Sequence, residues 1–125
     1  MILEQYAATL GQDIPFTGTR LSMTVDDRYR LQLLERPDGR VLVRTRLRSL
    51  PDAGPARDEV LRHCARLACG RMSSSPAACA VDARESGLWL QQLSDAGSTQ
   101  VLDEHVGAFV NELAFWVGAV QNEST

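Results

Sequence analysis

The sequence has no lysine, and all thirteen of its basic residues are arginines. Aromatic residues are also scarce, at 6% of the chain. No apolar run approaches the roughly 20 residues that a membrane-spanning helix needs, which argues against a helical membrane protein. The first residues lack the basic n-region and the apolar h-region of a signal peptide. We therefore expect the protein to stay in the compartment where it is made.

The three cysteines, Cys64, Cys69 and Cys79, are an odd number without a paired spacing. A disulfide framework favours an even set of cysteines, and a zinc site favours close cysteine pairs combined with histidines. Neither pattern is present. We therefore expect three buried, reduced thiols and no metal site.

Motifs for catalysis are missing too. The chain has no Gly-x-Ser-x-Gly, no phosphate-binding loop, no His-Glu-x-x-His and no EF-hand loop. His63 lies beside Cys64, but neighbouring residues on a helix point in different directions and rarely form a catalytic dyad. We therefore expect a protein that is not an enzyme, with no catalytic residue and no cofactor.

Length and composition fit one ordinary globular domain over residues 1–125, with 44% apolar and 23% charged residues. The charge is unevenly distributed along the chain. Residues 19–50 contain eight arginines and four acidic residues, a net charge of +4, whereas residues 73–125 contain one arginine and seven acidic residues, a net charge of −6. The chain is therefore electrostatically two-sided, although its total charge is only −3.

Helical periodicity marks three segments. The first covers residues 2–10. The second is an amphipathic helix at about residues 56–69, with Gly70 as its C-terminal stop. The third begins after Ser98 or Thr99, either of which can serve as its N-cap. Its apolar stripe is the clearest in the sequence and consists of Leu102, Val106, Phe109, Leu113, Trp116 and Val120.

Between the first two helices the hydrophobic period changes to two, which is typical of strands with one buried face. Apolar and polar residues alternate through residues 19–25, 28–33 and 40–48. Turn residues separate these segments at Asp26-Asp27 and at Pro37-Asp38-Gly39. The pattern predicts a three-stranded antiparallel meander with one apolar face and one arginine-rich face.

Two further short strands, at residues 78–82 and 88–93, are predicted to form a hairpin through residues 83–87. The predicted fold is therefore α+β. It consists of an antiparallel sheet of about five strands and three helices, in the order α-β-β-β-α-β-β-α.

Arginines dominate the polar face of the meander. Arg44, Arg46 and Arg48 share one face of their strand by the period of two, and Arg28 and Arg30 lie on the neighbouring strand. Such a face can bind nucleic-acid phosphates. However, RNA-binding sheets also expose aromatic residues, the only aromatic residue of this meander lies on its core face, and the pI is near 5.3. We favour arginines that are solvated, or that pair with acids of the C-terminal half or of a partner, over nucleic-acid binding.

The apolar residues are more numerous than one sheet face can cover. Leu34, Leu42 and Trp89 fall on the non-core phase of their strands. Exposed apolar patches usually mark protein interfaces. We therefore expect part of this surface to be buried by self-association and part by another polypeptide.

Five stretches and the aromatic residues of the last helix form a recognisable pattern. They are Leu10-Gly11, Leu31-Gln32-Leu33-Leu34, Gly39-Arg40-Val41-Leu42-Val43-Arg44, Leu47-Arg48-Ser49-Leu50-Pro51, Gly87-Leu88-Trp89-Leu90, and Phe109, Phe115 and Trp116. In this order of elements the chain resembles the class I chaperones of bacterial type III secretion, the Tir-chaperone (CesT-like) family. The resemblance covers nearly the whole chain.

The resemblance implies a homodimer in the cytoplasm of a Gram-negative bacterium. Such a chaperone binds the N-terminal segment of a secreted effector in extended form and keeps it soluble and competent for secretion, without ATP or any cofactor. The resemblance also implies the secretion ATPase as a further partner. The alternative on the same fold is a partner-switching regulator of secretion gene expression.

The surplus apolar surface and the resemblance together predict two interfaces. The client is expected to contact the first helix and the sheet at Leu3, Tyr6, Leu34, Leu42, Arg44 and Arg46. The dimer interface is expected to centre on the second helix and the following strand, with Val60, Leu61, Cys64, Leu67 and Ala68.

Overall fold

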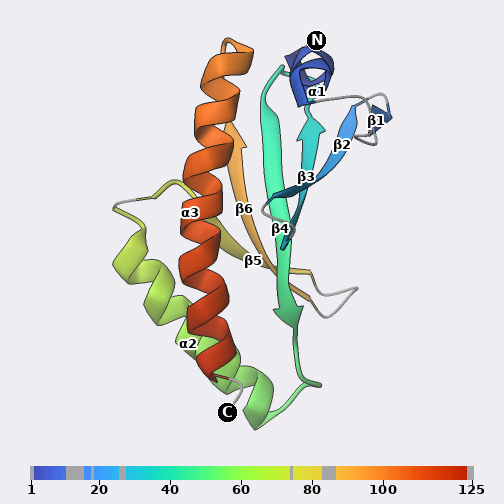
Figure 1. The fold of residues 1–125 in the computed structure, drawn as a ribbon. Helices are drawn as coiled ribbons and strands as arrows, with labels where there is room; N and C mark the ends of the chain where they lie inside the picture. Colours follow the sequence, from blue (N-terminus) through green and yellow to red (C-terminus); the bar gives the residue numbers. More distant parts are fainter. Residues whose placement is uncertain are drawn as a thin grey trace.

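Nine helices and strands follow one another along the chain in the computed structural model, which describes residues 2–10, 16–17, 19–25, 28–73, 75–82 and 87–123 (Figure 1). Their order is α1 (Ile2–Leu10), β1 (Phe16–Thr17), β2 (Arg20–Val25), β3 (Tyr29–Glu35), β4 (Val41–Ser49), α2 (Pro55–Arg71), β5 (Ala78–Asp82), β6 (Gly87–Ser94) and α3 (Thr99–Glu123). This order confirms the predicted fold class. The two-residue strand β1 is an addition that the sequence did not predict. The predicted turn at Asp26-Asp27 lies outside the described residues, as do residues 83–86 of the second hairpin.

The strands form one antiparallel sheet in the order β1-β2-β3-β4-β6-β5. The tight turn between β3 and β4 depends on Gly39, whose φ of 88° is readily adopted by glycine, and its N–H donates to the Arg36 carbonyl at 2.9 Å. β6 pairs with the edge of β4 that faces away from β3, so β4 lies in the middle of the sheet, between β3 and β6. β5 is therefore an edge strand on the side of α2.

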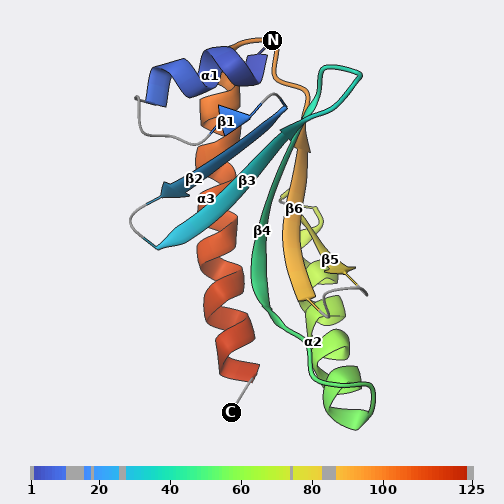
Figure 2. The same cartoon turned by 90° about the vertical axis from the view of Figure 1, so that its right-hand side faces the viewer.

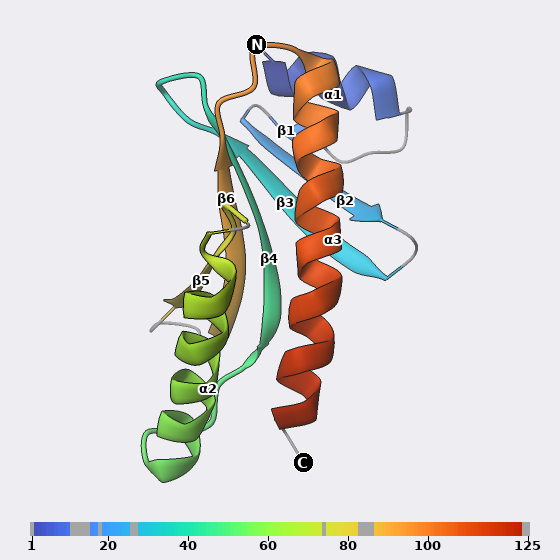
Figure 3. The same ribbon diagram turned by 90° about the vertical axis from the view of Figure 1, so that its left-hand side faces the viewer.

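The core lies between one face of the sheet and the helices. α3 crosses this face, α1 packs near the start of α3, and α2 packs against β5 and α3 (Figures 1 and 3). Leu21, Leu33, Leu90, Phe109 and Trp116 are at most 1% exposed. Leu102, Val106 and Leu113 are buried as well, which confirms the predicted stripe except at Val120, whose side chain lies outside the described ones.

Of two helix ends predicted from the sequence, the start of α3 is confirmed and the end of α2 is wrong. Ser98 caps α3, because its Oγ accepts a hydrogen bond from the Val101 N–H at 3.2 Å. The prediction that Gly70 stops α2 is wrong: the helix continues to Arg71, and the Met72 N–H still donates to the Ala68 carbonyl at 3.0 Å. No helix within the described ranges combines the length and apolar character needed to cross a membrane.

A register shift in β4 changes the predicted arginine face. Arg46 pairs with Trp89, but Arg48 pairs with Leu88, so two steps along β4 match one step along β6. Leu88 is 1% exposed and points into the core. Because opposite residues of an antiparallel pair share a side of the sheet, Arg48 does not share the outer face with Arg44 and Arg46. The prediction of three arginines on one face is therefore wrong for Arg48.

The three thiols are free, but they are not equally buried. Cys64 of α2 is buried, Cys79 of β5 is half-buried, and Cys69 is exposed, so the expectation of burial is wrong for Cys69. A hydrogen bond with Cys64, together with burial, raises the pKa of the Cys79 thiol far above its usual value. The Cys79 thiol therefore stays protonated, and both sulfurs contribute to the packing between α2 and β5.

Candidate functional site

A row of leucines crosses the face of the sheet that points away from the helices. Leu34 pairs with Leu42, and Leu42 pairs with Leu93, so the three side chains lie side by side on β3, β4 and β6. Leu34 and Leu42 are half-buried, whereas Leu93 is 40% exposed. We call these three residues the leucine row. They are an apolar surface that crosses three strands of the sheet.

Arg44 lies beside the leucine row and is held flat against the sheet. Its Nε donates to Gln32 Oε1 at 3.1 Å, and its guanidinium carbon lies 4.6 Å from the centre of the Trp89 ring. A cation–π contact of this kind contributes about 0.5–1 kcal/mol at an exposed site. Within the described part of the chain the partners of Arg44 carry no negative charge, so of the alternatives for this face, pairing with acids of the C-terminal half is not found at Arg44.

Trp89 and Arg46 pack over a glycine at the start of β6. A Cβ at Gly87 would lie 3.1 Å from Trp89 Nε1 and 3.3 Å from Arg46 Cζ, which is closer than ordinary contact distances. Arg46 is exposed, and its Nη2 donates to Ser49 Oγ at 3.1 Å. The small residue therefore lets an aromatic ring and a guanidinium lie close to the backbone on this face.

The two α1 residues expected to contact a client lie in the core. Leu3 and Tyr6 are each 1% exposed. The Tyr6 hydroxyl donates to Asp103 Oδ1 at 2.8 Å, and burial together with this bond raises the pKa of Tyr6 well above its usual value. The Leu3 N–H donates to Glu35 Oε1 at 3.0 Å. These contacts attach α1 to α3 and β3 and leave neither side chain exposed on the single chain.

The residues expected at a dimer interface divide into two groups. Val60 and Cys64 are 6% and 5% exposed and belong to the core of the single chain. Leu61, Leu67 and Ala68 pack partly against this core and keep part of their surface exposed. Only the second group therefore offers apolar surface to another molecule.

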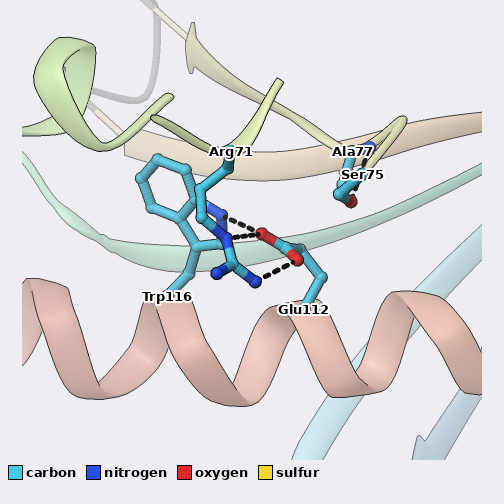
Figure 4. A network of polar contacts seen from close by, with 5 residues as sticks. All are labelled: Arg71, Ser75, Ala77, Glu112 and Trp116. Carbon is cyan, nitrogen blue, oxygen red and sulfur yellow. Dashed lines mark hydrogen bonds and ion pairs between the residues drawn. The ribbon is translucent and has the colours of Figure 1, made fainter. Parts of the chain in front are cut away.

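A polar network fixes the end of α2 to α3 (Figure 4). Arg71 Nε and Nη2 each donate to one oxygen of the Glu112 carboxylate at 2.8 Å, and Trp116 Nε1 donates to Glu112 Oε1 at 3.2 Å. Glu112 is 6% exposed, and its charge-assisted bonds to Arg71 hold the pKa of its carboxyl below the usual 4.5. The Arg71 guanidinium carbon also lies 4.0 Å from the centre of the Phe115 ring. The network sets the position of α2 and of its exposed side.

Sequence reasoning missed several exposed apolar side chains. Leu93 lies four residues after Trp89 on the same strand, so the period of two places both side chains on the outer face. This period could have identified Leu93 as an exposed residue. Met72 and Val81 are 74% and 46% exposed, beyond α2 and on the edge strand β5. Phe115 of α3 is also 36% exposed. The exposed apolar surface is thus larger near α2 and β5 than the sequence indicated.

The described residues contain no group of three or more His, Cys, Asp or Glu side chains that could hold a metal ion. The site consists of aliphatic, aromatic and guanidinium groups on a sheet surface. Such groups bind a polypeptide through apolar contact, stacking and hydrogen bonds.

Comparisons with known proteins identify the family and the fold. The model of the Tir chaperone protein (CesT) family matches residues 1–117, which confirms the resemblance indicated by the sequence. No curated protein matches the sequence significantly.

Solved structures with the same fold include a chain of the HopA1–SchA chaperone–effector complex, with 15% identity, a TM-score of 0.68, and coverage of 94% of this chain and 91% of that one. They also include a chain of the heterodimeric ExoU–SpcU complex of the Pseudomonas aeruginosa type III secretion system, with 17% identity, a TM-score of 0.66, and coverage of 94% and 97%. A chain of the ExsC–ExsE complex matches with 12% identity, a TM-score of 0.65, and coverage of 90% and 86%. At these identities the similarity shows the fold.

Proposed function

The chain belongs to the Tir chaperone protein (CesT) family, and we propose that it holds the N-terminal segment of a secreted effector in extended form in the bacterial cytoplasm. Membership of a family of type III secretion chaperones confirms the chaperone function expected from the sequence, and this function is not enzymatic. The proposal concerns which segment is bound and where it lies.

The observation that carries the proposal is the leucine row on the uncovered face of the sheet. Leu34, Leu42 and Leu93 offer an apolar surface across three strands, and Arg44 stacked on Trp89 extends it. Effector segments that are disordered when free lose conformational entropy on binding, and a long apolar interface offsets this cost. An extended segment fits a row of this kind because its alternate side chains face the sheet.

We also propose a homodimer formed through the exposed side of α2 and the edge strand β5. Leu61, Leu67 and Ala68 keep part of their apolar surface exposed, and Val81 on β5 is 46% exposed. A stable interface usually buries more than about 1,200 Å² in total. The secretion ATPase is a further proposed partner, on the basis of the resemblance alone, and co-sedimentation with the purified ATPase tests it.

Co-expression with N-terminal fragments of secreted effectors tests the proposed function. The expected result is that a fragment which is insoluble alone becomes soluble, co-purifies with the chain, and resists limited proteolysis over a contiguous stretch. If no effector fragment from the same bacterium is solubilised or protected, the proposed client-binding role is wrong.

A further inference from the structure

β3 and β4 separate from each other below the leucine row. They pair only from Glu35↔Val41 to Gln32↔Arg44, although β3 begins at Tyr29 and β4 continues to Ser49. Figure 2 shows the β2–β3 hairpin turning away from β4 beyond the last paired residues, with α3 behind the opening. We call this opening the fork.

The sequence explains why pairing stops there. Continued pairing would place Arg30 opposite Arg46, and like charges directly across a sheet are destabilising. Thr45 Oγ1 instead donates to the Arg30 carbonyl at 2.7 Å, so a side chain satisfies a backbone acceptor that the ladder leaves unpaired. The fork therefore opens at this single side-chain bond, beyond the last backbone pair Gln32↔Arg44.

A cavity of about 390 Å³ occupies the fork. Leu113 and Val117 of α3 form its apolar floor. Its other lining residues come from the two diverging strands and are Arg28, Tyr29, Arg30, Thr45 and Arg46. An apolar floor below three guanidinium groups is suited to a ligand that is both apolar and negatively charged.

Arg28 and Arg30 are exposed at the fork, and no carboxylate among the described residues pairs with either of them. The Arg28 guanidinium carbon lies over the Tyr29 ring, 5.3 Å from its centre. A guanidinium binds a carboxylate through two parallel hydrogen bonds, which are stronger than bonds between neutral groups. A carboxylate between these arginines would also relieve the repulsion between them.

We propose that the fork binds an acidic residue of the client segment, with a neighbouring apolar side chain of the client against Val117, the partly exposed residue of the floor. This inference rests on the proposed function and adds the kind of client sequence that is recognised. The apolar floor favours a polypeptide over a nucleic acid, and so does the net charge of −3. The fork lies next to the leucine row on the same strands, so one extended segment can contact both.

Two labelled peptides test the proposal by fluorescence anisotropy. One alternates leucine and glutamate over about ten residues, roughly 33 Å when extended, and its twin alternates leucine and glutamine. The wild-type protein is expected to bind the glutamate peptide about tenfold more tightly at low salt, because a charge-assisted pair contributes more than a neutral one. In Arg30→Gln, and separately in Arg28→Gln, this preference should fall to about twofold or less.

Arg20→Gln is the matched control, because Arg20 is exposed on the same sheet but does not line the fork. It should retain the preference for glutamate, and circular dichroism should show that all three variants are folded. Equal binding of the two peptides by the wild type overturns the proposal. So does an unchanged preference in both fork variants, or an equal loss of preference in Arg20→Gln.

Different results would contradict the chaperone role and the role of the fork. If the protein captures effector fragments but shows no preference for the glutamate peptide, the fork does not bind an acidic client residue, and the chaperone role stands. If the preference for the glutamate peptide depends on Arg30 but no effector fragment is captured, the fork binds acidic residues, and the proposed binding of effectors is wrong. If a labelled polyuridine binds more tightly than the glutamate peptide, the fork binds phosphates, and this result also overturns the proposal.

Discussion

Arg71 at the end of α2 and Glu112 in the middle of α3 form a two-bond ion pair, with both N···O distances at 2.8 Å. Glu112 is nearly inaccessible to water and also accepts a hydrogen bond from Trp116, whereas the Arg71 side chain is 34% exposed. The pair connects a helix whose contacts with the rest of the chain are few to the central helix of the core. The stability of the α2 position therefore depends on the charge of one carboxylate.

Glu112→Gln should lower the free energy of unfolding by about 1–2 kcal/mol. This is at the low end for a charged hydrogen bond, because the Arg71 side is partly solvated. Urea unfolding at neutral pH measures the change. The exposed pair between Arg62 and Glu59 is the control, and Glu59→Gln should have no measurable effect. An equal loss in both variants would contradict the role of the buried pair.

The same carboxylate predicts a pH dependence. The pKa of Glu112 in the folded protein lies below its usual 4.5, so the ionised form is the one that folding stabilises. The contribution of the pair is fully present above the unfolded pKa and is lost as the pH falls through the folded pKa. Wild type and Glu112→Gln should therefore differ in stability at pH 7 and converge in strongly acidic buffer. A constant difference across this range would be inconsistent with the argument.

Leu42→Glu should abolish capture of an effector fragment while the fold is retained. The substitution places a charge at the centre of the leucine row, where a client would otherwise bury an apolar side chain. Gln100→Glu is the control, because Gln100 is exposed near the start of α3, away from the row and from the fork. Pull-down of co-expressed fragments and circular dichroism measure the two properties. Retained capture by Leu42→Glu would locate the client elsewhere.

Leu67→Glu should shift the protein from dimer to monomer, or to aggregate, because it places a charge on the partly exposed apolar side of α2. Arg66→Glu, on an exposed neighbour, should remain dimeric. Sedimentation velocity at micromolar concentration provides the measurement. A wild-type protein that sediments as a monomer under these conditions would refute the proposed dimer.

Client binding should depend only weakly on salt overall. Association through apolar contacts tolerates several hundred millimolar salt, and it carries a negative heat-capacity change on binding. Binding of nucleic acid would instead weaken steeply with salt, because neutralised phosphates release counterions. Calorimetric titration at low and high salt, over a range of temperatures, distinguishes the two. A steep salt dependence together with binding of RNA would favour nucleic-acid binding over binding of a client polypeptide.

The sequence by itself determined the fold class, because its local patterns agree with the tertiary structure. Alternation of apolar residues in β2 to β4 and the stripe of α3 place the same side chains in the core as the structure does. The phase of Leu34, Leu42 and Trp89 likewise identified the uncovered face of the sheet, since a period of two fixes the side on which each side chain lies.

Only the tertiary structure decided which of the remaining apolar side chains stay exposed. From the sequence, Leu3, Tyr6 and Val60 were expected to contact another molecule, just as Leu42 was. Packing against α3, β3 and β5 buries these three side chains. The register shift that removes Arg48 from the outer face also has no local signal, because it depends on how β6 pairs with β4 across about 40 residues of chain. The same holds for the fork, whose cavity exists because α3 lies behind strands that are far from it in the sequence. Period and charge are properties of a segment, whereas burial and register are properties of the neighbours that the segment acquires on folding.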